Sequence, residues 1–175
     1  MARFVSIRAV GVFTTALTLV GAAPLRALAA PPSGSASEEE IAKARELFLR
    51  AQGEEERTEY LAALEKFERV LAVKDTSSVR FHLGYCSERL GRLAAAMKYY
   101  EVALRESERE GNSEVKRLAA KAIESLQSRV PRVAVRCPAN AKCEVRLDGK
   151  AISESDLALP LLVDPGRHNL TAKGP

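Results

Sequence analysis

The feature that most constrains the fold of this chain is a long stretch without proline. From Glu38 to Val130 the sequence contains no proline and is rich in Ala, Leu, Glu, Arg and Lys, which favour helices. Pro131 ends the stretch, because the residue before a proline is pushed out of the helical region of backbone space. The composition therefore predicts a helical domain over residues 38–130. Apolar periodicity divides it into five helices, over residues 38–52, 59–73, 78–90, 93–110 and 113–129.

Two of these helices are similar in sequence. Residues 63–71 read ALEKFERVL and residues 96–104 read AMKYYEVAL, at an offset of 33. Small side chains at Ala63 and Ala96 would let two helices approach closely, and larger rings at Phe67 and Tyr100 would fill the space one turn later. A period of 33 or 34 residues with two helices per unit is typical of helical repeat arrays. The alternative is a five-helix bundle in which the similarity is accidental.

The second unit resembles the tetratricopeptide repeat family. Leu83-Gly84 precedes Ala96 by twelve residues, as in that family, and Gly91 lies in the turn between the helices. Three positions of the family pattern hold other residues, namely Arg80, Ser87 and Glu108. The resemblance covers residues 37–110 and implies that the first helix of each hairpin lines a concave face. It implies a peptide-binding groove formed by Phe81, Tyr85, Glu88 and Arg89, whereas the alternative is an ordinary helix surface.

The fifth helix is expected to close the helical domain. Gly111 and Asn112 tolerate the left-handed conformation and would end the fourth helix, and Ser113 is the expected N-cap of the fifth. Helical repeats usually need about three units for stability, and this sequence contains two. The fifth helix is therefore predicted to cover the apolar face of the fourth.

After Pro131 apolar residues alternate, which predicts short β-strands. A hairpin that turns near Asn140 would place Cys137 opposite Cys143 and Val133 opposite Leu147, with every apolar residue on one face. Facing residues of antiparallel strands lie at a separation that a disulfide accepts. We therefore predict a disulfide between Cys137 and Cys143.

The same region resembles the PEGA domain, a small β-sandwich named for a Pro-Glu-Gly-Ala turn. The corresponding residues here read Pro138-Ala139-Asn140-Ala141, and DG and DPGRH segments follow downstream. The predicted fold class is thus α+β, with tetratricopeptide-like hairpins over 38–130 and an antiparallel β-sandwich module over 131–175. Members of that family continue into further strands, so whether the module is complete at Pro175 stays open. An uncovered last strand over 167–173 would offer its edge to a second copy or to a partner strand.

Residues 1–29 have the pattern of a signal peptide. A basic start with Arg3 and Arg8 precedes an uncharged apolar run from Ala9 to Ala23, and Ala-Leu-Ala stands at 27–29. Residues 30–37, APPSGSAS, have the composition of a flexible linker. The predicted location is the periplasm or cell envelope of a Gram-negative bacterium, where disulfides persist. Retention of residues 1–29 as a membrane anchor is the alternative to cleavage.

The charge of the chain argues against nucleic acid as a partner. The full chain carries a net charge of +4, but residues 1–29 hold three arginines and no acid. Their removal leaves 24 basic and 23 acidic residues, a net charge of +1. A nearly neutral chain lacks the clustered lysines and arginines that phosphate backbones require, and it is weakly attracted to anionic membranes.

No motif for catalysis, a cofactor or a metal is apparent. The sequence contains no phosphate loop, dinucleotide fingerprint or Ser-centred elbow. His82 and Cys86 lie four residues apart, a spacing that can hold a metal, but Cys86 is expected in the helical core. A catalytic pair of Cys137 with His168 would need a free thiol. We therefore expect neither enzymatic activity nor a metal or cofactor.

The sequence thus predicts an exported, non-enzymatic scaffold or adaptor that binds a protein or peptide ligand at the bacterial envelope. The alternative is a cell-wall or glycan-binding protein in which the β-module makes the contact and the helices are a spacer. Exposed aromatic residues on the β-module would favour the glycan hypothesis, and an aromatic groove on the helices would favour the scaffold. The identity of the partner is not apparent from the sequence.

Overall fold

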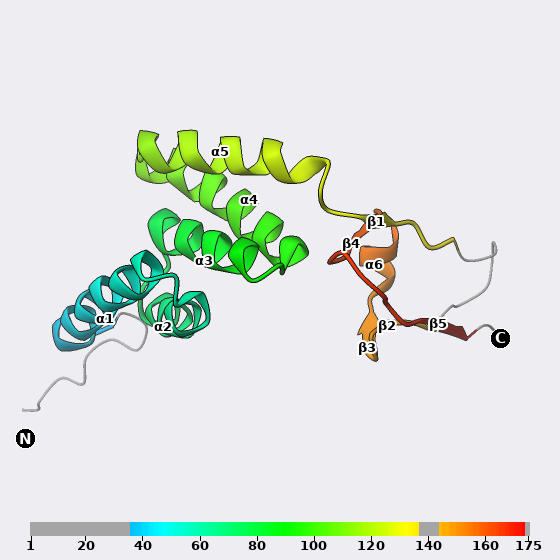
Figure 1. Ribbon diagram of the computed structural model, residues 1–175, viewed down its shortest axis with the longest axis horizontal. Coiled ribbons are helices and arrows are strands. Elements are labelled where there is room, and N and C mark those ends of the chain that lie inside the picture. Colours follow the sequence, from blue (N-terminus) through cyan, green and yellow to red (C-terminus); the bar gives the residue numbers. More distant parts are fainter. Residues whose placement is uncertain (1–35, 137–143, 174–175) are drawn as a thin grey trace, which may run out of the picture. The chain divides into compact units, whose positions relative to one another are not determined.

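The computed structural model describes residues 36–136 and 144–173 (Figure 1). The signal-peptide pattern, most of the predicted linker and both cysteines of the predicted disulfide lie outside these residues. That disulfide therefore stays a prediction. The described residues form a mainly helical fold with a few short antiparallel strands, which agrees with the predicted α+β class.

The five predicted helices are present. Their bounds, together with a short sixth helix that was not predicted, are α1 (Glu38–Glu56), α2 (Tyr60–Val73), α3 (Ser77–Arg89), α4 (Leu93–Glu110), α5 (Ser113–Gln127) and α6 (Glu154–Leu157). The prediction was wrong about the end of the first helix, which continues four residues past Gln52. Tertiary contacts hold this extra turn, because Lys66 Nζ lies 2.6 Å from Glu54 Oε1 and His82 Nδ1 lies 2.9 Å from Glu55 Oε2.

The capping residues explain where α1 and α5 begin and where α4 ends. At the start of α1, Ser37 and Glu40 form a capping box, in which each side chain meets the other residue's backbone N–H. Gly111 ends α4 with φ +70°, as predicted. The predicted N-cap of α5 was wrong by one residue. Asn112 takes that place, because its side-chain oxygen accepts a hydrogen bond from the N–H of Val115 at 3.1 Å.

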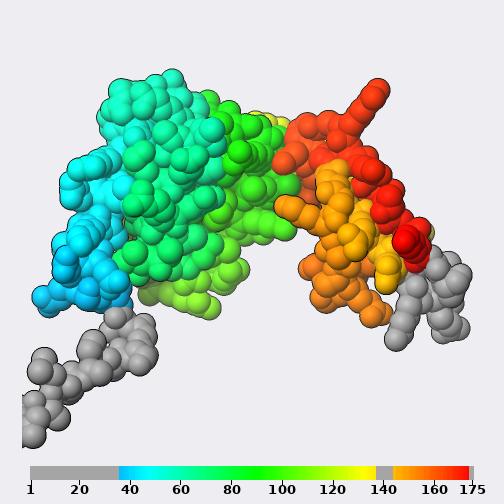
Figure 2. All heavy atoms as spheres, turned by 90° about the horizontal axis from the view of Figure 1, so that it is seen from below, coloured from blue at the N-terminus to red at the C-terminus, as the bar shows by residue number. Residues whose placement is uncertain are grey.

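Consecutive helices from α1 to α5 pack side by side (Figure 1), and Figure 2 shows α1 (blue) to α4 (green) as one continuous body of packed atoms. Residues 33 apart occupy equivalent places in the first two hairpins. The Phe48 and Phe67 rings have centroids 5.4 Å apart, and the Phe81 and Tyr100 rings have centroids 5.5 Å apart. Each pair joins the first helix of a hairpin to the second. The core therefore repeats with the period of the sequence.

Gly84 marks the closest approach of α3 to α4. A Cβ atom built at this position would lie 2.7 Å from Cδ1 of the Tyr100 ring, which is too close for any side chain. The predicted small contact residues Ala63 and Ala96 are also completely buried. The absence of a side chain at residue 84 is what allows the buried Tyr100 ring to lie against the backbone of α3.

The strands after Pro131 are short. They are β1 (Arg132–Val133), β2 (Glu144–Leu147), β3 (Lys150–Ile152), β4 (Leu161–Leu162) and β5 (Leu170–Lys173). Among the described residues, β1 pairs with β4, and β2 lies between β3 and β5, all antiparallel. Asp148 and Gly149 connect β2 to β3 with φ +50° and +79°, the left-handed pair that a two-residue hairpin turn requires.

The predicted register of residues 133 and 147 was wrong. Val133 pairs with Leu161, and Leu147 pairs with Lys150 and Leu170 instead of with Val133. The tight turn after β2 folds β3 directly back onto it, and β5 takes the other edge, so β2 has no edge left for residue 133. The last strand also begins three residues later than predicted, at Leu170.

Two contacts join the strand region to the helices. Leu162 packs against a buried cluster of α4 and the end of α5, which includes Leu93 and Leu126. Asp164 Oδ1 accepts a hydrogen bond from the N–H of Ala94 at 2.8 Å. The N-cap residue of α4, Arg92, makes no side-chain cap of its own. A carboxylate 70 residues away therefore satisfies a free N–H group at the start of α4.

Candidate binding groove

The four residues predicted for a groove all belong to α3 but have different surroundings. Phe81 is half-buried and packs on the Tyr100 ring and on the cluster formed by Ala103, Val115 and Ala119. Two of these residues belong to α5. The side chain of Phe81 thus serves packing between α3, α4 and α5.

Glu88 holds the same three-helix junction together by polar contacts. Its Oε2 accepts a hydrogen bond from the Tyr100 hydroxyl at 3.1 Å, and its Oε1 accepts one from Nη1 of Arg129. Burial, together with the negative charge of Glu88, raises the pKa of Tyr100, so the hydroxyl stays protonated and remains a donor. Both carboxylate oxygens of Glu88 therefore accept hydrogen bonds from within the chain.

Tyr85 and Arg89 lie together at the surface. The Arg89 guanidinium centre lies 4.9 Å from the centroid of the Tyr85 ring, and Nη2 donates a hydrogen bond to the Tyr85 hydroxyl at 3.0 Å. The Tyr60 and Tyr85 rings pack edge-to-face, with their centroids 6.1 Å apart. Of the four predicted residues, only Arg89 is exposed. The structure brings Tyr85 and Arg89 together and commits Phe81 and Glu88 to contacts between helices.

A groove of about 460 Å³ lies elsewhere on the helical region, between α1, the end of α2 and the start of α3. We call it the α1–α3 groove, and its lining is mainly apolar. It is lined by Ile41, Ala44, Arg45, Phe48, Leu49, Val70, Lys74, Thr76, Ser78 and Val79. Leu49 is 67% exposed, and contact of a leucine side chain with water is unfavourable.

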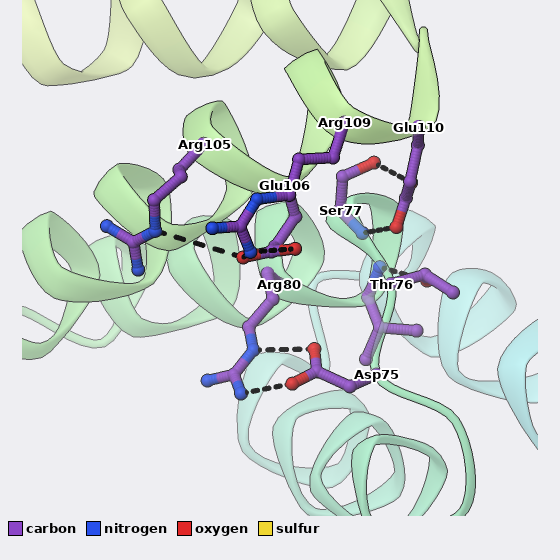
Figure 3. Close-up of polar contacts among 9 residues, drawn as sticks. Asp75, Thr76, Ser77, Arg80, Arg105, Glu106, Arg109 and Glu110 are labelled. Atoms are coloured by element: carbon purple, nitrogen blue, oxygen red, sulfur yellow. Dashed lines mark hydrogen bonds and ion pairs between the residues drawn. The ribbon is translucent and has the colours of Figure 1, made fainter.

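Polar contacts at the α2–α3 junction fix one wall of this groove (Figure 3). Thr76 caps α3 by accepting a hydrogen bond from the N–H of Val79 at 3.3 Å. The N–H and hydroxyl of Ser77 both donate to the carboxylate of Glu110, at 3.0 and 2.5 Å. Arg80 forms two hydrogen bonds with Asp75, at 2.8 and 2.6 Å. The start of α3, which carries Ser78 into the groove, is therefore held rigidly against α4.

The charged residues of the groove are of one sign. Arg45 and Lys74 are exposed, and within the described part of the chain neither has a carboxylate within 4.0 Å. Among the described residues, no aspartate or glutamate lines the groove. The arrangement offers an apolar floor with two free cations at its rim. Such a surface suits an apolar side chain that has carboxylates nearby.

The sequence analysis did not anticipate the α1–α3 groove, although the repeat offset contained a signal for it. Subtraction of 33 from Ser78 and Phe81 leads to Arg45 and Phe48, which do line the α1–α3 groove. The sequence analysis named groove residues only in the second unit, because that unit carries the family resemblance. Peptide binding by the four residues of α3 stays a prediction.

The His82–Cys86 pair belongs to the core of the first two hairpins. Glu55 Oε2 lies 2.9 Å from His82 Nδ1 and 3.6 Å from Cys86 Sγ, and the His82 ring stacks on Phe67 at 5.0 Å. Burial, with the nearby Glu55, raises the pKa of Cys86 to about 12. The thiol is therefore protonated and unsuited to nucleophilic attack. The described residues include no group of three or more His, Cys, Asp or Glu arranged to hold a metal ion.

Comparisons with family models, curated proteins and solved structures find no match. None of the helices within residues 36–136 and 144–173 is both long and apolar enough to cross a bilayer.

Proposed function

We propose that this protein is an exported, non-enzymatic scaffold or adaptor that binds a segment of another protein at the bacterial envelope. In this proposal residues 38–130 form a tetratricopeptide-like domain, and residues 131–175 form a PEGA-like module that supports assembly. The proposal includes the periplasm or envelope of a Gram-negative bacterium as the location. It rests on the signal-peptide pattern, the 33-residue period and the α1–α3 groove.

The observation that carries the proposal is the exposed Leu49 beside Arg45 and Lys74, neither of which pairs with a carboxylate in the part of the chain that the structure describes. An apolar groove with an exposed leucine is stabilised when a partner removes it from water, and unpaired rim charges select the partner by its charge. The Phe48 ring gives this floor a rigid aromatic surface. A protein segment with apolar and acidic residues matches both features.

The glycan-binding alternative has less support. Sugar rings are commonly bound by stacking on aromatic side chains, and the sequence contains no Phe, Tyr or Trp after Pro131. The seven aromatic residues that follow the leader all belong to the helices. The exposed surface of the strand region therefore lacks the residues that this alternative needs.

The test is a pull-down from an envelope fraction with three versions of the chain. The groove variant carries Arg45→Glu and Lys74→Glu. The matched control carries Lys98→Glu and Lys121→Glu, which reverse two exposed lysines that have no carboxylate partner in the described residues and do not line the groove. We expect the wild type and the control to retain the same proteins and the groove variant to lose them. Equal recovery by all three, or retention of peptidoglycan in their place, would contradict the proposal.

A further inference from the structure

The chain carries its own segment that is complementary to the α1–α3 groove. This segment, residues 153–159, reads SESDLAL and includes α6. Its Leu159 is 73% exposed, more than any other large apolar residue in the described ranges, and Leu49 of the groove is second at 67%. Two large apolar side chains thus remain in water on separate parts of the chain.

The charges of the segment are opposite to those of the groove. Glu154 and Asp156 are exposed, and no basic group lies within 4.0 Å of either carboxylate among the residues that the structure describes. Asp156 Oδ2 accepts a hydrogen bond from Ser153, which also caps the helix and so fixes the direction of this turn. The segment therefore presents two carboxylates ahead of an exposed leucine. The groove presents two cations beside an apolar floor.

We propose that the groove of one molecule binds the 153–159 segment of a second copy of this chain. Leu159 would enter the apolar floor beside Phe48 and Leu49, and the carboxylates would face Arg45 and Lys74. The inference rests on the proposed function, because it names the partner of the groove that the scaffold uses.

The geometry of such a contact is head-to-tail. The groove belongs to α1–α3 and the segment belongs to the strand region, so each molecule uses two different surfaces. A heterologous contact of this kind leaves one groove and one segment free at the ends, and it forms open chains unless the rotation closes a ring. Assembly would depend on concentration and would weaken with salt, because the charges lie at the surface.

The experiment measures the molar mass of the full chain by light scattering over a hundredfold range of protein concentration. Wild type and the Lys98→Glu/Lys121→Glu control should associate with the same concentration dependence. The Arg45→Glu/Lys74→Glu variant and a Leu159→Asp variant should each remain monomeric, with a dissociation constant raised by about tenfold or more. Leu61→Asp, at a leucine that is 50% exposed outside the groove, is the matched control for the apolar change and should associate normally.

Mixing the two defective variants gives the decisive result. The groove variant keeps an intact segment, and the Leu159→Asp variant keeps an intact groove, so an equimolar mixture should form 1:1 dimers and nothing larger. A monomeric wild type, or a mixture that remains monomeric, would overturn the inference. If the groove variant loses envelope proteins while the wild type is monomeric, the proposed function stands and only self-recognition fails.

Association through the strand edge is a distinct outcome. Next to the β2–β5 pair, the Asp148 N–H donates a hydrogen bond to Asn169 O at 2.8 Å, so residue 169 faces β2. Backbone groups of successive residues in an antiparallel strand point to opposite sides, so the N–H of Ala172 points to the free edge of β5. Ala172→Pro would therefore block strand addition. Assembly that survives both groove and Leu159 changes but is lost in Ala172→Pro would overturn the groove contact.

Discussion

The helical region and the strand region of this protein differ most in what holds them together. Of the 20 buried apolar residues in the described ranges, 18 lie between Ala44 and Val130, and the strand region contributes Val145 and Val163. All four residues of β5 are exposed. Among these strands of two to four residues only β2 contains a buried side chain, that of Val145, so they cannot supply a core of their own. The helices therefore provide the stability, and the strands depend on turns and on contacts with α4.

The largest expected effect comes from the shared core of the first two hairpins. Phe67→Ala removes a completely buried ring that packs on Phe48 and His82, and it should lower the free energy of unfolding by about 3–5 kcal/mol. Chemical denaturation monitored by circular dichroism measures this change. Leu49→Ala, at an exposed site, is the control and should change stability by less than about 0.5 kcal/mol. Equal losses in both variants would show that residue 67 is outside the core.

A pair of glycines sharpens the account of helix packing. Gly84→Ala places a methyl group 2.7 Å from the Tyr100 ring and should cost about 1–3 kcal/mol. Gly53→Ala, also within a helix, meets nothing closer than 3.5 Å and should stabilise the protein by about 0.5–1 kcal/mol. Thermal midpoints of the two variants should therefore move in opposite directions. A rise in both would contradict the close approach of α3 and α4.

The dependence of the strand region on α4 is tested at Asp164. Asp164→Ala removes the acceptor for the Ala94 N–H and should destabilise the protein by about 1 kcal/mol, the usual effect of a lost helix cap. Asp164→Asn keeps an oxygen acceptor and should lose less. Amide hydrogen exchange should show faster exchange at the first turn of α4 in the alanine variant. Unchanged exchange there would mean that Asp164 does not cap α4.

The smallest effect is a pH dependence confined to the strand region. His168 Nδ1 lies 2.7 Å from Asp148 Oδ2, and this hydrogen bond raises the pKa of His168 above its ordinary 6.5 and lowers that of Asp148 below 3.8. The raised histidine pKa contributes stability below pH 6.5 that is lost as pH rises through the folded-state value. The lowered aspartate pKa contributes stability above pH 3.8 that is lost as pH falls through its folded-state value.

The strands should therefore be most protected between about pH 4 and 6.5. Amide exchange in β2 and β5, corrected for intrinsic rates, should speed up between pH 6 and 8.5 in the wild type. His168→Gln should remove this dependence, whereas exchange in α2 should show none in either protein. A pH response that persists in His168→Gln would assign it to another group.

The same contrast explains how much of the fold could be predicted from sequence. Helix periodicity and Gly111 as a stop signal are local, and the structure confirms them. The extension of α1 depends on Lys66 and His82, which are distant in sequence, so no local pattern reveals it. The strand pairing depends on which edge β5 occupies and on an aspartate that caps a helix 70 residues earlier.

The groove was missed for a similar reason. The family pattern directed attention to the second hairpin, where α5 already covers Phe81 and Arg129 already occupies Glu88. Whether a helix face is free depends on what packs over it, and the sequence of that helix does not contain this information. The 33-residue offset from Phe81 to Phe48 was the one usable signal.

The most direct test of the α1–α3 groove as the contact site compares the two regions by photo-crosslinking. A photoreactive amino acid replaces either Leu49, in the groove, or Leu170, on edge strand β5, in the full chain expressed in a Gram-negative envelope. Both side chains are exposed, at 67% and 42%, so both can react with a bound partner. We predict discrete crosslinked products from residue 49 that disappear when Arg45→Glu and Lys74→Glu are added. Products from residue 170 alone would contradict the account and assign the contact to the strands.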